Sequence, residues 1–177
     1  MLDAGVRALL KVSDPDRPAG VIGTVGTIAS RAYERAAAEL GHSGELVTCA
    51  CPGFVEFVER GETTSPGVRI LAERLLAPVV EAKVDALLLG CTHYPYLART
   101  ISDVMGPDVV LVSSADETAF ALADLLTELD LAHPDRTRRG AHRFVSSGDV
   151  RAFAALGSRL LGPELAGAQR WIPGQGR

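Results

Sequence analysis

A cysteine, a threonine and a histidine follow one another directly at the end of an apolar segment, in the stretch LLLGCTHYPYL (residues 87–97). The thiol of Cys91 can act as a nucleophile or as a general base, and His93 lies close enough in sequence to exchange a proton with it. Amides at the start of a following helix and a nearby imidazole both favour the thiolate form. The alternative is structural, because small buried cysteines are common in protein cores.

Two enzyme chemistries fit these residues. A Cys/His hydrolase needs a base held by a third group and an oxyanion hole, and residues so close on one turn seldom place the imidazole correctly against the thiol. A proton-transfer enzyme needs only a thiol facing a carbon acid, with polar groups that hold the substrate's carboxylates. The hydroxyls of Thr24, Thr27 and Thr92, with backbone amides at helix starts, could supply those groups.

The remaining cysteines, Cys49 and Cys51, bring the count to three. In a reducing compartment these are thiols rather than a disulfide framework. Their C-x-C spacing lacks the C-x-x-C of zinc and redox motifs, and no second Cys/His pair accompanies it. We therefore expect a structural role at a strand end and no metal site.

Composition excludes several classes of protein. The 177 residues are 47% hydrophobic and 23% charged, as in a globular protein of one large or two small domains. The net charge of −4, with basic residues clustered only at residues 136–139, argues against a nucleic-acid surface. GTVGT (residues 23–27) lacks the length and the Lys of a phosphate-binding P-loop. Without a membrane-length apolar segment or a signal peptide, we expect a cytoplasmic protein with no membrane partner.

Strand-like and helix-like segments alternate along the chain. Short apolar segments predict strands at residues 20–24, 45–50, 84–90 and 108–114 and near Phe144. Amphipathic segments predict helices near residues 4–11, 28–40, 66–78, 96–105, 115–129 and 148–161. The alternation predicts an α/β protein with a parallel sheet between two helix layers, a three-layer α/β/α domain. The segment 84–90 does not alternate, so it is expected to be buried on both faces.

Several residues set the expected helix boundaries and faces. Thr27, Ser65 and Ser147 are expected as N-caps, and Ser114 forms a capping box with Glu117. Pro78 is expected to end or kink its helix, whose inner stripe would be Val68, Leu71, Leu75 and Val79. Trp171 and Ile172 form a strand-like piece before a frayed end.

Ligands of open parallel sheets bind beyond the carboxyl ends of the strands. Three expected strand ends carry reactive or polar groups, at residues 24–27, 49–52 and 91–93. The elements therefore place the candidate residues on one edge of the sheet.

Several motifs, in one order, resemble those of glutamate racemases in the aspartate/glutamate racemase superfamily. GCTHYPYL resembles the motif of their second catalytic cysteine. VIGTVGTIASRAY is similar to their GTxxTxxSxxY segment, and CPGFVEFVERG to their CPxFVxxVE segment. VSSADETA and SSGD match later stretches, so the resemblance runs from about Gly20 to Gly162.

The resemblance implies a cofactor-independent racemase in which two cysteines face opposite sides of the glutamate α-carbon. Cys91 would be the second of these, His93 would assist its proton transfer, and Glu59 would act near that histidine. Thr92, His93, Thr24 and Thr27 would contact the substrate. From the residues alone, Glu59 can also be a solvated helix end and Thr27 only an N-cap, while Tyr94 and Tyr96 are expected to pack rather than to bind.

The chain departs from the family pattern in lacking its DSGxGG segment, its YG pair and its CN(T/S)A motif with the first catalytic cysteine. Cys49 and Cys51 lie in a different motif and do not replace that cysteine. The expected organisation is a leading helix or linker (1–17), the α/β second domain of the two-domain racemase fold (18–115), and a remnant of the first domain (116–177). We expect these 177 residues alone to show no measurable glutamate racemisation.

In this family the product D-glutamate supplies peptidoglycan synthesis, and the substrate is glutamate. The resemblance also allows a homodimer and a contact with DNA gyrase. The alternatives are aspartate racemase-like activity and an inactive fragment with a protein-interaction role. The exposed stripes expected for the helices after residue 116 favour association.

Overall fold

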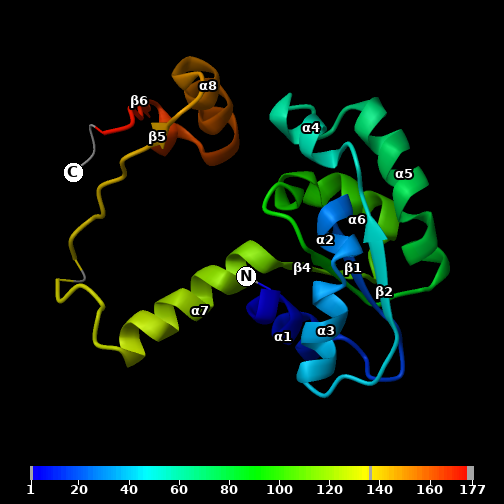
Figure 1. Ribbon diagram of the computed structural model, residues 1–177. Coiled ribbons are helices and arrows are strands. Elements are labelled where there is room, and N and C mark those ends of the chain that lie inside the picture. Colours follow the sequence, from blue (N-terminus) through cyan, green and yellow to red (C-terminus); the bar gives the residue numbers. More distant parts are fainter. Residues whose placement is uncertain (1, 136, 175–177) are drawn as a thin grey trace. The chain divides into compact units, whose positions relative to one another are not determined.

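The structure is a computed structural model that describes residues 2–135 and 137–174 (Figure 1). The chain divides into two compact units. The first consists of Met1–Val58 and Glu62–Ala132, and the second of Glu59–Gly61 and His133–Arg177. The boundaries expected at residues 17 and 115 follow the family's two-domain arrangement, and they stay predictions.

The first unit is built on a four-stranded parallel sheet, as the sequence predicted. Its strands are β1 (Ala19–Gly23), β2 (Leu46–Ala50), β3 (Ala86–Leu89) and β4 (Val110–Ser113), in the order β2-β1-β3-β4. The two central strands are buried along their whole length. The expectation that the third strand is buried on both faces is confirmed.

Helices cover both faces of this sheet, which confirms the three-layer arrangement (Figure 1). On one face α1 (Leu2–Val12) packs so closely that a Cβ at Gly5 would meet Leu88 at 3.1 Å. On the other face α5 (Pro66–Glu81) packs beside α6 (Ala98–Met105), and Val79 approaches Gly20 beside Leu87. Leu87 and Leu88 thus fill opposite sides of the sheet. The leading helix α1 is part of the core of this unit, with Val6 and Leu9 fully buried.

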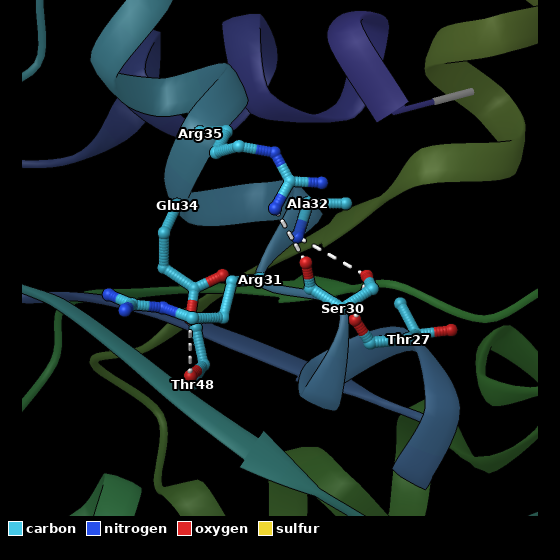
Figure 2. Close-up of polar contacts among 7 residues, drawn as sticks. All are labelled: Thr27, Ser30, Arg31, Ala32, Glu34, Arg35 and Thr48. Carbon is cyan, nitrogen blue, oxygen red and sulfur yellow. Dashed lines mark hydrogen bonds and ion pairs between the residues drawn. The ribbon is translucent and has the colours of Figure 1, made fainter.

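The expected single helix over residues 28–40 is wrong, because two helices occupy this segment (Figure 2). In α2 (Val25–Ala29) the N-cap is Thr24 rather than Thr27, and its hydroxyl accepts from the Thr27 amide at 3.3 Å. The Ser30 hydroxyl then donates to the Thr27 carbonyl at 2.6 Å and accepts from the Ala32 amide. Arg31 takes the left-handed conformation, with φ 52°, before α3 (Ala32–Glu39) begins. A side chain that bonds to the backbone in this way competes with the helical ladder.

Pro78 does not end α5, which continues to Glu81. Ser65 caps the helix as expected and accepts from the Val68 amide at 3.3 Å. The fully buried residues are Val68, Ala72, Leu76 and Val79, whereas Leu71 and Leu75 of the expected stripe are only half-buried. Pro78 is exposed, and burial of Val79 beside it stabilises the last turn.

The cap of α7 (Ser114–Glu128) also differs from the expectation by one residue. Ser113, not Ser114, accepts from the Asp116 amide at 3.3 Å. Ser114 is buried, and its hydroxyl donates to the Leu89 carbonyl at 2.8 Å. The alternation of β4 turns Ser114 into the core, so only Ser113 is free to cap the helix.

The second unit contains a short parallel pair, β5 (Val145–Ser146) and β6 (Gln169–Arg170), with α8 (Val150–Leu161) and the 3-10 turn η2 (Pro163–Leu165) between them. Asp149 caps α8 through two backbone amides, so Ser147 is not its cap. The last strand precedes Trp171 and Ile172 rather than containing them. Of the frayed end expected after Ile172, residues 175–177 lie outside the described residues. Within the described part of the chain, no helix has the length and apolar character needed to span a bilayer.

Candidate active site

The three segments expected at strand ends, residues 24–27, 49–52 and 91–93, lie at one edge of the sheet, where β1, β2 and β3 end. Ile22 on β1 pairs with Cys49 on β2 and with Leu89 on β3. Two residues beyond these paired positions, each strand leads to a candidate residue: Thr24 after β1, Cys51 after β2 and Cys91 after β3. Because the strands are parallel and in this register, these three residues leave the sheet at the same level. Thr24 lies between the two cysteine-bearing strand ends.

Cys91 and His93 are brought together by the turn that follows β3. Cys91 Sγ lies 3.9 Å from His93 Nδ1, a contact whose donor depends on the histidine tautomer. The Tyr94 amide donates to the Cys91 carbonyl at 3.1 Å and so starts the 3-10 helix η1 (Tyr94–Leu97). Both side chains are half-buried. An imidazole at this distance can exchange a proton with the thiol.

The predicted hydroxyl groups lie in the first unit. Thr24 and Thr27 hydroxyls are 2.8 Å apart, half-buried, and either can donate to the other. Thr92 is exposed, directly after Cys91. These hydroxyls are of the type that can bind a carboxylate. Glu59, the exposed last residue of α4 (Phe54–Glu59), falls in the second unit, and its role beside His93 stays a prediction.

Gly90 fixes the path of the chain into Cys91. Its amide donates to the Ile22 carbonyl at 2.8 Å. A Cβ at this position would lie 2.8 Å from that carbonyl oxygen and 2.8 Å from the Tyr33 hydroxyl. Only glycine therefore allows this close approach of β3 to β1 and α3.

Tyr33 is a neighbour of the site that the sequence reasoning did not single out. It is buried on α3, and its hydroxyl donates to the Gly90 carbonyl at 3.3 Å. Burial, and then the negative charge of an ionised Cys91, raise the pKa of Tyr33 above its usual value. The available signal was the tyrosine that ends the GTxxTxxSxxY-like segment.

Tyr94 is a packing residue, as expected. It is fully buried, and its ring meets Phe54 edge-on, with centroids 5.4 Å apart and an interplanar angle of 81°. Its hydroxyl donates to the Cys51 carbonyl at 3.2 Å, and burial raises its pKa. Tyr94 therefore ties the turn that holds His93 to the end of β2.

No group that could hold a metal ion occurs within residues 2–135 and 137–174, where no three His, Cys, Asp or Glu side chains come together. The Cys91 thiol and the His93 imidazole are groups of the kind that can transfer protons, and the hydroxyls of Thr24, Thr27 and Thr92 are groups that can form hydrogen bonds.

The sequence profile of the Asp/Glu/Hydantoin racemase family matches residues 1–122 of the chain. A protein named glutamate racemase from Acidothermus cellulolyticus is 51% identical over 146 residues, which cover 82% of this chain and 55% of the relative. A glutamate racemase from Mycobacterium tuberculosis is 48% identical over 150 residues, or 85% of this chain and 55% of the relative. The chain spans about half the length of the curated relatives it matches.

Solved structures of glutamate racemases have the same fold. The enzyme from Bacillus anthracis superposes with a TM-score of 0.87 at 34% identity, covering 98% of this chain and 63% of that one. The enzyme from Francisella tularensis, solved in complex with D-glutamate, superposes with a TM-score of 0.81 at 27% identity. This match covers 97% of this chain and 61% of that one. The α/β fold predicted from the sequence is therefore that of glutamate racemase structures.

Proposed function

The chain belongs to the Asp/Glu/Hydantoin racemase family, and from this premise we propose that it supplies the Cys91 side of a glutamate racemase active site. The reaction removes the α-proton of glutamate from one face and returns a proton to the opposite face. The observation that carries the proposal is the Cys91–His93 pair, with Sγ and Nδ1 3.9 Å apart at the carboxyl end of the sheet.

The roles of the residues follow from their chemistry and from the family resemblance. The Cys91 thiolate takes the α-proton of one enantiomer, and the Cys91 thiol returns a proton to the same face in the reverse direction. His93 accepts and restores the proton of Cys91, and Glu59 acts on His93. Thr92, Thr24 and Thr27 hold the substrate's carboxylates by hydrogen bonds.

A thiol on one side of the α-carbon performs only one of the two proton transfers. Cys49 and Cys51 stand at the end of β2, where Cys49 donates to the Leu75 carbonyl at 3.0 Å, and we assign them no transfer. We therefore expect no measurable racemisation by these 177 residues alone, since losing half of a positioning clamp removes many orders of magnitude in rate.

The wider function proposed is the supply of D-glutamate for peptidoglycan, in the cytoplasm, where the free thiols of this chain would stay reduced. A homodimer and a contact with DNA gyrase are predictions of the resemblance alone.

The test follows the circular dichroism of L-glutamate over hours, with L-aspartate as a second substrate. The chain is assayed alone and joined to a preceding family segment that carries the DSGxGG and CN(T/S)A motifs. We expect turnover of glutamate only by the joined protein, and its loss in the Cys91→Ala variant.

Three outcomes would contradict the proposal or one of its parts. Racemisation by the joined protein that survives Cys91→Ala would remove Cys91 from the chemistry. Turnover by the 177 residues alone that disappears in the same variant would keep Cys91 but disprove the one-sided assignment. Faster turnover of aspartate would overturn the substrate.

A further inference from the structure

The backbone that leads from β3 into Cys91 is held by hydrogen bonds from two neighbouring elements. The Gly90 amide donates to the Ile22 carbonyl of β1 at 2.8 Å, and the Gly90 carbonyl accepts from the Tyr33 hydroxyl of α3 at 3.3 Å. That carbonyl belongs to the peptide bond whose nitrogen is the amide of Cys91. The Tyr33 hydroxyl therefore contacts the peptide group through which the chain enters Cys91.

The glycine at position 90 explains why this contact matters. The close approach of β1 and α3 excludes a Cβ here, because it would lie 2.8 Å from the Ile22 carbonyl oxygen and 2.8 Å from the Tyr33 hydroxyl. Without a Cβ, sterics restrict the rotation of the following peptide only weakly. The hydrogen bond from Tyr33 supplies the missing restriction, and so fixes where the Cα and the thiol of Cys91 lie.

The Tyr33 side chain is itself firmly held. It is 4% exposed and packs in the core cluster that contains Val6 and Leu9. Just before α3, Arg31 takes the left-handed conformation, and the Ser30 hydroxyl bonds to the backbone on both sides of this break (Figure 2). The break sets the direction in which α3 leaves α2, and with it the direction of Tyr33.

Tyr33 remains a hydrogen-bond donor when Cys91 ionises. Burial, and then the negative charge of an ionised Cys91, raise the pKa of Tyr33 above its usual value. Besides His93 on its own turn, Tyr94 on η1 also interacts with Cys91, and the pKa of Tyr94 is raised chiefly by burial. Both phenols therefore stay protonated over the pH range in which thiols ionise.

We propose that Tyr33 is a positioning residue for Cys91, whose hydroxyl holds the peptide between Gly90 and Cys91 so that the thiol faces the His93 imidazole. The proposal rests on the proposed function only in taking Cys91 as the group that transfers protons. The contact between Sγ and Nδ1 is long, at 3.9 Å, so a small rotation of the preceding peptide breaks it. Its loss removes an imidazole that favours the thiolate.

The test measures how fast iodoacetamide alkylates Cys91 in the folded 177-residue chain across a pH series, by mass spectrometry of the tryptic peptide 84–99. Tyr33→Phe keeps the ring in the core and removes only the hydroxyl. We expect alkylation at neutral pH to slow by roughly three- to tenfold, as for the loss of one hydrogen bond. The midpoint of the pH profile should rise. This readout needs no racemase activity, so it decides the role of Tyr33 even if the proposed function fails.

Two further variants separate positioning from a general loosening of the strand end. Ser114→Ala removes a hydroxyl that donates to the Leu89 carbonyl, one residue before Gly90, and should slow alkylation far less than Tyr33→Phe does. In the His93→Gln background, Tyr33→Phe should have little further effect, because no imidazole remains to be lost. Circular dichroism of each variant establishes that it is folded.

The joined protein described above gives a kinetic readout of the same role. Tyr33→Phe should lower kcat for glutamate and leave KM nearly unchanged, since the hydroxyl acts on the thiol rather than on substrate binding. If the joined protein does not racemise glutamate, the proposed function fails, and the alkylation rate alone decides the role of Tyr33.

A measurement on the wild-type chain keeps the proposal testable if Tyr33→Phe does not fold. The carbon-13 resonance of Tyr33 Cζ should shift with pH at the midpoint of Cys91 alkylation, and this shift should disappear in Cys91→Ser. A Tyr33 resonance that does not respond to Cys91 would overturn the proposal. So would a folded Tyr33→Phe chain with the wild-type rate and pH profile, an equal slowing in Ser114→Ala, or an undiminished effect in the His93→Gln background.

Discussion

Strand β3 and helix α7 are both rich in leucine, yet they have opposite environments. Leu87 and Leu88 on β3 are 0% exposed, whereas Leu125 and Leu129, on α7 and at its C-terminal cap, are 47% and 58% exposed. Strand β3 lies between two strands and two helix layers. Helix α7 buries only Ser114, in its first turn. Leucine content therefore does not set burial, which depends on whether a partner surface is present.

The difference also shows where apolar side chains remain exposed to solvent, which is on α7. Burying a leucine side chain stabilises by about 1.5–3 kcal/mol, and α7 does not gain this. A groove of about 380 Å³ continues the apolar surface between α1, β4 and α7, and is lined by Val12, Val110 and Phe120 among others. This agrees with the expectation from the sequence that the apolar stripe of this helix needs a sheet.

The largest effect is expected for Leu88→Ala. The side chain packs in the core with Val6, Leu9 and Val21, so its loss leaves a cavity and should reduce the free energy of unfolding by about 3 kcal/mol. The matched variant Leu125→Ala should change it by less than about 0.5 kcal/mol. Denaturant unfolding, monitored by circular dichroism, measures both changes. Equal changes would contradict the claim that leucines on β3 stabilise the fold and those on α7 do not.

The next largest effect is expected for Gly90→Ala. The added methyl group meets the Ile22 carbonyl and Tyr33 at the end of β3, so the free energy of unfolding should fall by about 2 kcal/mol. The same measurement on Gly26→Ala is the control, since a Cβ there meets nothing within 4 Å. If both variants unfold at the same denaturant concentration as the wild type, the close approach at Gly90 is not a constraint.

Ser114→Ala probes the junction between the buried and the exposed element. Removing the hydroxyl that donates to the Leu89 carbonyl should lower the free energy of unfolding by about 1 kcal/mol. Ser43→Ala, at an exposed serine, should cost much less. Thermal and denaturant unfolding of the pair distinguish the two. A Ser114 variant as stable as the Ser43 variant would show that the β3–α7 junction contributes nothing.

The smallest change in stability is expected for Leu125→Lys, below about 0.5 kcal/mol, since the side chain is exposed. Its effect should appear in self-association instead, because a charge interrupts the apolar surface of α7. Sedimentation velocity over a concentration series should show a smaller associated fraction than for the wild type. Thr127→Lys introduces the same charge at a polar position, and an equal reduction there would assign the effect to charge alone.

The sequence predicted element types better than element ends. The parallel strands and the buried β3 were predicted, because continuous apolar segments and helical periodicity are local properties. The caps at Thr27, Ser114 and Ser147 were wrong, since several serines and threonines compete for each helix start. The helix break at Ser30 depends on hydrogen bonds that spacing does not reveal.

At the candidate site the sequence by itself determined which reactive groups exist and that Cys91 and His93 stand two residues apart after an apolar strand. Only the tertiary structure decided their surroundings. The order β2-β1-β3 and its register place Thr24 between Cys51 and Cys91, and α3 brings Tyr33 onto Gly90. The reason is that strand order and register are fixed by hydrogen bonds and burial between residues far apart in the chain, whereas motifs and periodicity record only near neighbours.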